Sequence, residues 1–212
     1  MTRTRAKICG ITSVGDARTA VLAGADAIGL NRYPPSARYI SVQEAIEINA
    51  QIPASVTKVA LFVNEAATQV ESFLEQVSVD LLQFHGDEDE AYCNRFGVPY
   101  IKVFKVESGA ELVTRIKQFP SSQGILVDSM VPGMQGGTGK VFDWQGLPDF
   151  DKPLILAGGL NKDNVSRAIA TVKPYAVDVC SGVESAPGVK DPTKIKEFLA
   201  AVAAADRGSR YG

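Results

Sequence analysis

The sequence predicts a single-domain α/β protein, a (β/α)8 TIM barrel. Short apolar runs rich in β-branched residues alternate with longer helical patterns along the whole chain. About eight such units in 212 residues leave about 26 residues for each strand, helix and pair of loops. The GxGxxG pattern of an open dinucleotide-binding sheet does not follow the first run. We therefore favour the closed barrel over the doubly wound sheet.

Eight segments fit strands, and each is almost wholly apolar. Such runs suit a parallel sheet covered on both faces, because a sheet with one wet face would show polar residues at every second position. The predicted strands are Ala6–Cys9, Asp26–Leu30, Val56–Phe62, Leu81–Phe84, Tyr100–Phe104, Gly124–Asp128, Leu154–Ala157 and Ala176–Cys180.

Helix starts are marked between these strands. Ser41, with Glu44 three residues later, forms a capping box that predicts a helix directly after it. Asn64 precedes an amphipathic stretch with a period of about 3.6 residues, and Asn161 opens another. Pro192 suits the first position of the last helix. The barrel is expected to span residues 1–205, and residues 206–212 to form a flexible tail after the helix frays.

Composition excludes several classes of protein. The 22 basic and 24 acidic residues leave a net charge of −2, and the positive electrostatic field is then too weak to bind nucleic acid. No run approaches the ~18 apolar residues of a membrane span. Cys9, Cys93 and Cys180 form no CxxC or zinc spacing. We expect free thiols in a cytoplasmic protein that binds neither nucleic acid nor membranes.

The active site of such a barrel forms at the carboxyl ends of the strands, so the strand ends are where functional residues are sought. Polar residues and glycines gather there, namely Cys9-Gly10, Gln83 with His85, Asp128, Gly158-Gly159 and Ser181-Gly182. Glycines allow close backbone approach, and N–H groups at the start of a short helix attract phosphate. The glycines after the last two strands predict a phosphate site, although each pair alone could form only a tight turn.

Cys9 and Asp128 are candidates for an acid–base pair. A buried, inert thiol is the usual state of cysteine, whereas a lowered pKa would let Cys9 act as a base. Asp128 ends an apolar strand, where packing does not explain a carboxylate, although capping the next loop would. Placed on opposite sides of a phosphate-anchored sugar, the two groups would catalyse an isomerisation.

Other candidates would bind substrate. His85 is the only histidine, so a multi-histidine metal site is excluded; we expect Gln83 and His85 to contact substrate, a satisfied core histidine being the alternative. Arg38, in a proline-containing loop, could bind a carboxylate through two hydrogen bonds, a solvated surface arginine being the alternative. Segment 136–140 lacks nucleotide P-loop spacing and is expected to close over substrate, or to be a surface loop.

Taken together, these strand ends resemble the phosphoribosylanthranilate isomerase family of tryptophan biosynthesis. Each segment is weak alone, but their joint order is specific and spans nearly the whole chain. The segments are Lys7–Thr12, Gly24–Gly29, Ser36–Tyr39, Gln83–Gly86, Val127–Asp128, Gly136–Gly139 with Phe142–Trp144, Leu156–Leu160 and Asp178–Glu184.

The resemblance implies an Amadori rearrangement of N-(5-phosphoribosyl)anthranilate to 1-(2-carboxyphenylamino)-1-deoxyribulose 5-phosphate, with no metal and no organic cofactor. It implies that Cys9 removes the C2 proton, that Asp128 protonates the ribose ring oxygen, and that Arg38 pairs with the anthranilate carboxylate. The phosphate would be held by backbone N–H groups of Gly158, Gly159, Ser181 and Gly182. The implied partner is a phosphorylated small molecule, and the chain is expected to be a monomer or a homodimer.

Two positions depart from the family pattern. The run Leu30-Asn31-Arg32-Tyr33 stands where the family usually has Phe–Val–Phe or a similar run after the strand-two glycine, which would bring an amide and a second cation near the anthranilate ring. Cys180 replaces a serine or alanine before Ser181, a change expected to leave phosphate binding intact.

Related barrels are less consistent with these residues. The histidine-pathway aminoaldose isomerase would have an aspartate in place of Cys9, and indoleglycerol-phosphate synthase would want a lysine there. The remaining alternative is a non-catalytic or altered-specificity phosphosugar-binding barrel, against which the presence of both Cys9 and Asp128 argues.

Overall fold

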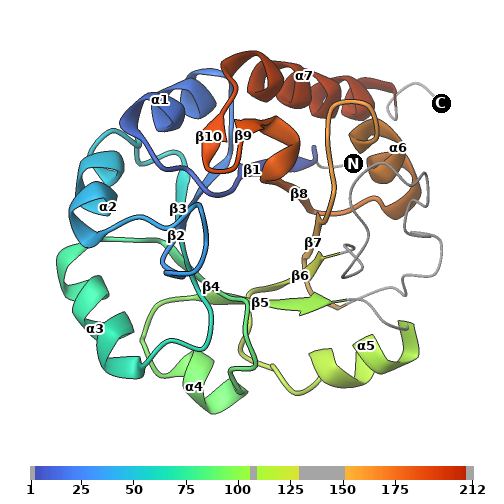
Figure 1. Ribbon diagram of the computed structural model, residues 1–212. Coiled ribbons are helices and arrows are strands. Elements are labelled where there is room, and N and C mark those ends of the chain that lie inside the picture. Colours follow the sequence, from blue (N-terminus) through green and yellow to red (C-terminus); the bar gives the residue numbers. More distant parts are fainter. Residues whose placement is uncertain (1–2, 106–108, 129–150, 209–212) are drawn as a thin grey trace.

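A computed structural model describes residues 3–105, 109–128 and 151–208. Eight parallel strands pair in chain order and close into a barrel, because β1 also pairs with β8 (Figure 1). The strands are β1 (Arg5–Ile8), β2 (Ala27–Asn31), β3 (Thr57–Phe62), β4 (Leu81–Phe84), β5 (Tyr100–Lys105), β6 (Gly124–Asp128), β7 (Leu154–Ala157) and β8 (Ala176–Val179). The predicted barrel is confirmed, and each predicted segment overlaps one strand.

Helices form a ring outside the strands (Figure 1). They are α1 (Val14–Leu22), α2 (Val42–Asn49), α3 (Ala67–Gln76), α4 (Glu90–Asn94), α5 (Gly109–Ile116), α6 (Val165–Val172) and α7 (Pro192–Gly208). After β8 come a short 3-10 helix, η2 (Ser181–Val183), and a hairpin of β9 (Glu184–Ala186) and β10 (Val189–Lys190), neither of which was predicted. Within the described ranges, no helix is long and apolar enough to cross a membrane. Segment 136–140 lies outside the described residues.

Local capping explains where α2 and α6 begin. The Ser41 side chain accepts from the Glu44 N–H, and the Glu44 carboxylate accepts from the Ser41 N–H at 2.7 Å, so the predicted capping box is confirmed. The helix α6 starts at Val165, four residues after the predicted Asn161. Asn161 instead closes a turn, in which its side-chain oxygen accepts from the backbone N–H of Asn164 at 3.2 Å.

The last helix extends beyond its predicted end. We expected fraying before Asp206, but α7 continues to Gly208. The Asp206 carboxylate accepts hydrogen bonds from the backbone N–H and the hydroxyl of Thr4, at 2.9 and 2.8 Å. This contact joins the end of α7 to the chain just before β1, and so it orders backbone that the sequence pattern assigned to a tail.

Alternate residues of the strands face two separate apolar cores. Tyr100 and Phe104 of β5 belong to the larger core between strands and helices. Ile101 and Val103 of the same strand belong to a smaller core made only of strand residues, which fills the barrel interior. Because side chains alternate along a strand, a residue's position relative to these two sets decides whether it faces the helices or the interior.

Candidate active site

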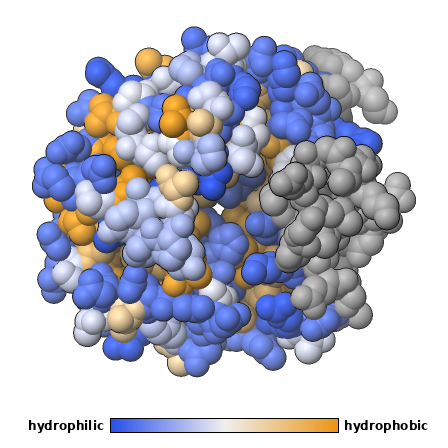
Figure 2. All heavy atoms as spheres, viewed as in Figure 1, coloured by the Kyte–Doolittle hydropathy of each residue, from blue (hydrophilic) through white to orange (hydrophobic). Residues whose placement is uncertain are grey.

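Polar residues enter the barrel interior near the carboxyl ends of several strands. Ile8 packs in the outer core, so its neighbours Lys7 and Cys9 face inward. The same alternation directs Asp178 of β8 and Gln83 of β4 inward, and all of these side chains are buried. Figure 2, viewed along the barrel as in Figure 1, shows hydrophilic residues around a hollow at the centre of this face. A polar interior site therefore lies where the barrel opens.

The environment of Cys9 stabilises a thiolate. Lys7 donates from Nζ to Oδ1 of Asp178 at 2.9 Å, and its positive charge acts on the Cys9 sulfur. A hydrogen bond from Cys180, together with the Lys7 charge, outweighs burial and the Asp178 charge, so the pKa of Cys9 is lowered to about 6. Burial opposes the charge on Lys7, but Asp178 and Cys9 together raise the pKa of its ammonium group. The Lys7 ammonium therefore favours the thiolate form of Cys9.

Two glycines leave room for this arrangement. A Cβ on Gly29 would lie 2.8 Å from the Cys9 sulfur and 3.0 Å from Nζ of Lys7. Gly10 has φ +70°, and a Cβ there would lie 2.7 Å from Cδ of Arg38. Glycine is required at both positions because the reactive thiol and the arginine stem occupy the space that a side chain would fill.

His85 and Asp128 face the same interior. Nε2 of His85 lies 3.9 Å from Oδ2 of Asp128, which is too long for a hydrogen bond. Burial outweighs the nearby carboxylates and lowers the pKa of His85, so the imidazole is neutral at pH 7 and the contact is not an ion pair. The charges of Lys7 and Asp178 act on both His85 and Cys9, so the structure places these candidates around one interior.

Arg38 lies at the mouth of the barrel in an ion pair that the sequence analysis did not predict. It donates from Nε and Nη2 to the two carboxylate oxygens of Glu184, at 2.8 and 2.7 Å. Glu184 also accepts from Nζ of Lys190 at 2.9 Å. The alternative of a solvated surface arginine is wrong. Among the described residues, Nη1 of Arg38 makes no hydrogen bond, so one edge of the guanidinium is left for a ligand.

The departure at Asn31 and Arg32 affects the interior less than expected. The Arg32 guanidinium lies over the rings of Tyr39 and Phe73, 4.9 and 5.1 Å from their centroids, on the helix side of the sheet. Arg32 therefore does not bring a second cation into the barrel interior. Asn31 does face inward, and its Nδ2 donates to the Ser36 hydroxyl at 3.1 Å, which shapes the loop after β2.

The glycine-containing loops after β7 and β8 meet. Gly158 and Gly159 have φ values of +90° and +62°, conformations that glycine adopts without strain. A Cβ on Gly182 would lie 1.9 Å from the carbonyl oxygen of Leu160, so the two loops are in contact there. Ser181 begins η2 directly after β8. The four residues predicted to bind phosphate are thus gathered at two touching loops.

Gln83 lies two residues before His85 on the inward face of its strand and is 1% exposed. Its Oε1 accepts no hydrogen bond from the described residues.

Sequence reasoning did not identify Lys7, Asp178 or Glu184 as parts of the site. Lys7 and Asp178 could have been found from the sequence, because each is a charged residue two positions before the end of a predicted, otherwise apolar strand. Within the described ranges, no group of three or more His, Cys, Asp or Glu side chains is placed to hold a metal ion.

Comparison with known proteins identifies the family. The sequence model described as N-(5'phosphoribosyl)anthranilate (PRA) isomerase matches residues 6–201. The chain belongs to this family. It is 51% identical over 203 residues to N-(5'-phosphoribosyl)anthranilate isomerase of Pseudomonas fluorescens, covering 95% of this chain and 97% of that protein. The family resemblance drawn from the strand ends is therefore confirmed, and with it the isomerase class.

Solved phosphoribosylanthranilate isomerases share the barrel. The Thermotoga maritima structure superposes with a TM-score of 0.87 at 39% identity, covering 95% of this chain and 99% of that one. A second structure, with a TM-score of 0.81 at 35% identity and the same coverage, is described as a complex with reduced 1-(o-carboxyphenylamino)-1-deoxyribulose 5-phosphate. That relative binds a phosphorylated small molecule of the type predicted for this chain.

Proposed function

We propose that the chain converts N-(5-phosphoribosyl)anthranilate to 1-(2-carboxyphenylamino)-1-deoxyribulose 5-phosphate in tryptophan biosynthesis, with Cys9 as the base and Asp128 as the acid. Membership of the isomerase family supports the reaction. The observation that supports the roles is the buried Cys9 thiol, with a pKa lowered to about 6 beside the Lys7 ammonium. A thiol that only packs in the core would have its pKa raised by burial, as Cys93 does.

The reaction follows from these two groups. Asp128, in its acid form, donates a proton to the ribose ring oxygen; the C1–O bond breaks, and the nitrogen lone pair forms a C1=N bond. The Cys9 thiolate removes the proton from C2, whose electrons form a C1=C2 bond and neutralise the nitrogen. The resulting enol then gains a proton at C1 and loses one from its oxygen, which gives the ketone product. The steps transfer protons and rearrange bonds within the substrate, so they need no external electron donor or acceptor.

The Lys7–Asp178 pair suits a base that changes charge during the reaction. While Cys9 is a thiolate, Lys7 stabilises it through its positive charge. When Cys9 takes the proton, Lys7 remains paired with Asp178 at 2.9 Å, so no isolated charge is left buried.

The two ends of the substrate would bind at different parts of the barrel mouth. Glu184 holds Arg38 so that its Nη1 edge can bind the anthranilate carboxylate. Backbone N–H groups of the touching loops after β7 and β8 would bind the phosphate, as predicted for Gly158, Gly159, Ser181 and Gly182. Neutral His85, and Gln83 below it, would hydrogen-bond the sugar between these anchors.

We also infer a cytoplasmic location, because the three cysteines are free thiols. For the assembly, the prediction stays a monomer or a homodimer, which size-exclusion chromatography with light scattering distinguishes.

The test is an assay of the purified chain with N-(5-phosphoribosyl)anthranilate, followed by loss of substrate fluorescence. Cys9→Ala and Asp128→Asn should each lower kcat by about 100-fold or more, the usual contribution of a positioned acid or base. Asp128→Asn should leave KM nearly unchanged, because the lost proton donor acts in the transition state. Cys93→Ala removes a thiol from the outer core and serves as the control. Wild-type turnover in Cys9→Ala would show that another group is the base.

A further inference from the structure

We propose that Lys190 is a positioning residue for carboxylate recognition, because it neutralises Glu184 and so leaves Arg38 with a net positive charge for an anionic group on the aromatic ring of the substrate. The inference rests on the proposed binding of the anthranilate carboxylate by Arg38. It concerns a fully buried cation that lies outside the barrel strands and takes no part in the proposed proton transfers.

The β9–β10 hairpin, which carries Lys190, packs against the loop that carries Arg38. Gly188, at the turn of the hairpin, has φ +80°, and a Cβ there would lie 2.5 Å from the carbonyl oxygen of Ala37. The hydroxyl of Thr12, in the loop after β1, donates to the carbonyl of Gly188 at 2.6 Å. These contacts hold the hairpin against the residue directly before Arg38.

Lys190, Glu184 and Arg38 form a chain of three charges that ends at the mouth of the barrel. Nζ of Lys190 donates to Oε1 of Glu184 at 2.9 Å, and Arg38 donates to both oxygens of the same carboxylate, at 2.8 and 2.7 Å. The exposed fraction of the side chain rises along the chain, from 0% for Lys190 to 4% for Glu184 and 26% for Arg38. Of the three, Arg38 is therefore the one that can meet a ligand.

One anion between two cations leaves this chain with a net charge of +1. Burial opposes the charge on Glu184, but hydrogen bonds from Arg38 and Lys190 outweigh it and lower the pKa of the carboxyl group, so Glu184 stays ionised. An Arg38–Glu184 pair alone would be neutral, and a substrate carboxylate at Nη1 of Arg38 would then lie near an uncompensated anion. Lys190 compensates Glu184 from within the fold and leaves the Nη1 edge open.

Packing alone does not explain a lysine at this position. A buried ion pair is often no more stabilising than apolar residues of the same size, so burial of Lys190 does not by itself favour the fold. Lys190 also donates from Nζ to the carbonyl oxygen of Cys180 at 3.0 Å, just before the predicted phosphate-binding residue Ser181. An experiment must therefore separate an effect on the carboxylate from an effect on the phosphate end.

Binding of two product analogues separates these effects. One is reduced 1-(2-carboxyphenylamino)-1-deoxyribulose 5-phosphate, and the other is the same compound without the carboxylate. The ratio of their dissociation constants, measured by isothermal titration calorimetry, reports the preference for the carboxylate, because both analogues share the phosphate. In Lys190→Met this preference should fall by about tenfold or more, since the remaining charges of Glu184 and Arg38 cancel.

Two further variants test whether charge is the cause. Lys190→Met combined with Glu184→Gln restores the net charge to that of wild type and should recover most of the lost preference. Lys194→Met is the matched control, because Nζ of Lys194 contacts Glu184 through its backbone carbonyl, at 2.7 Å, and the preference should stay that of wild type. If Lys190→Met does not fold, Glu184→Gln with and without Lys190→Met gives the same test: the preference should be lower with it, and equal preferences would contradict the inference.

Three outcomes overturn the inference. They are an unchanged preference in Lys190→Met, even if both analogues bind more weakly; a double variant with no more preference than Lys190→Met; and a loss in Lys194→Met as large as that in Lys190→Met. A wild type without any preference would show that the proposed pairing of Arg38 with the carboxylate is wrong. If wild type has the preference and Lys190→Met keeps it, only this inference fails, so the two failures are distinguishable.

Discussion

Two buried lysine–carboxylate pairs in this barrel have similar geometry and different surroundings. Lys7 and Asp178 lie 2.9 Å apart in the interior, with side chains 5% and 8% exposed. Lys102 and Glu88 lie 2.8 Å apart, with side chains 4% and 2% exposed. The first pair lies beside the Cys9 thiol, whose pKa is lowered. The Cys93 thiol donates to the carbonyl of Glu88 in the second pair at 4.0 Å, yet burial raises its pKa, so a buried ion pair does not by itself mark the reactive site.

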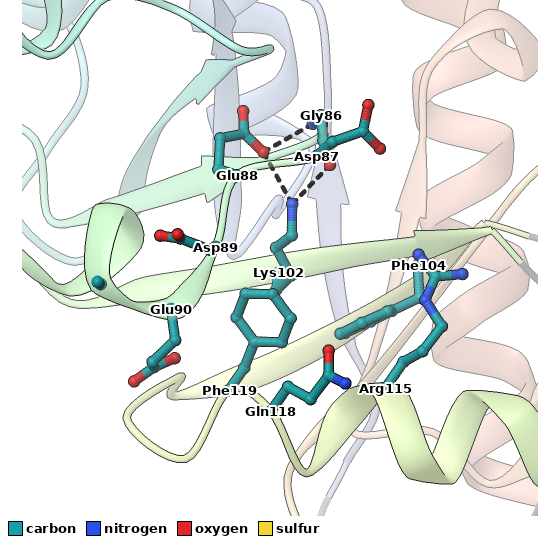
Figure 3. A pocket seen from close by; sticks show the side chains of 11 residues that line it. Gly86, Asp87, Glu88, Asp89, Glu90, Lys102, Phe104, Arg115, Gln118 and Phe119 are labelled. Carbon is teal, nitrogen blue, oxygen red and sulfur yellow. Dashed lines mark hydrogen bonds and ion pairs between the residues drawn. The ribbon is translucent and has the colours of Figure 1, made fainter.

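The Lys102 pair joins loops. Figure 3 shows Nζ of Lys102 directed at Glu88 and at the carbonyl of Gly86, which it binds at 2.6 Å. Glu88 also accepts from the backbone N–H groups of Asn64 and Gly86, at 2.7 and 2.9 Å. A cavity of about 430 Å³ lies beside this pair, between β5 and the neighbouring helices. Its charged lining therefore has a structural explanation.

The face of the sheet explains the difference. Cys9 follows Lys7 by two residues, and both face the interior; Phe104 follows Lys102 by two residues and packs in the outer core. The comparison teaches that a lysine in an apolar strand acquires a chemical role from the residue beside it on the same face.

The largest expected difference between the pairs is in turnover. Lys7→Met should lower kcat/KM at pH 7 by about 100-fold or more, because the thiolate loses its cation and Asp178 is left as an unpaired buried anion. Lys102→Met should leave kcat of the folded enzyme unchanged. Steady-state assays of both variants, corrected for the folded fraction, make the comparison, and equal losses would contradict it.

The next largest effect is on stability, where the two pairs should behave alike. Removing either lysine should cost about 3–5 kcal/mol in the free energy of unfolding, because each leaves a buried carboxylate without its partner. Urea denaturation measures this loss. Combining Lys102→Met with Glu88→Gln should recover part of it, since the unpaired charge is then also removed. A double variant less stable than Lys102→Met would indicate that the backbone hydrogen bonds to Glu88 dominate.

The smallest effect on stability and turnover is expected from crowding of the Cys9 thiol. Gly29→Ala should lower stability by about 1–3 kcal/mol, because its Cβ would press on Cys9 and Lys7 at 2.8 and 3.0 Å. It should also lower kcat by displacing the sulfur. Gly15→Ala is the matched control, since the nearest atom to its Cβ would be Oγ of Ser13 at 3.7 Å, an ordinary contact. Thermal unfolding and turnover of the two variants test this, and similar behaviour would argue against a tightly packed thiol.

Local patterns predicted most of the fold. Apolar runs located the eight strands, and the capping box at Ser41 located the start of α2. The start of α6 was wrong because Asn161 satisfies a turn instead of a helix. The end of α7 was wrong because Asp206 binds Thr4, a residue 202 positions away, and no local pattern records such a contact.

The candidate site was predicted in part. Strand ends identified Cys9, His85 and Asp128, and the structure places all three around one interior. The partners of these residues were missed because they come from distant segments. Arg38 and Glu184 are 146 residues apart, and their pairing depends on the hairpin after β8.

The sequence by itself determined the architecture and the inward face of each strand, because both follow from the spacing of apolar residues over a few positions. The tertiary structure alone decided the chemistry of the thiol. Closure of the barrel sets β8 against β1, which brings Lys7 to Asp178 across 171 residues and Cys9 to Cys180. The pKa of Cys9 depends on charges and donors within a few ångströms, and only the closed barrel supplies them.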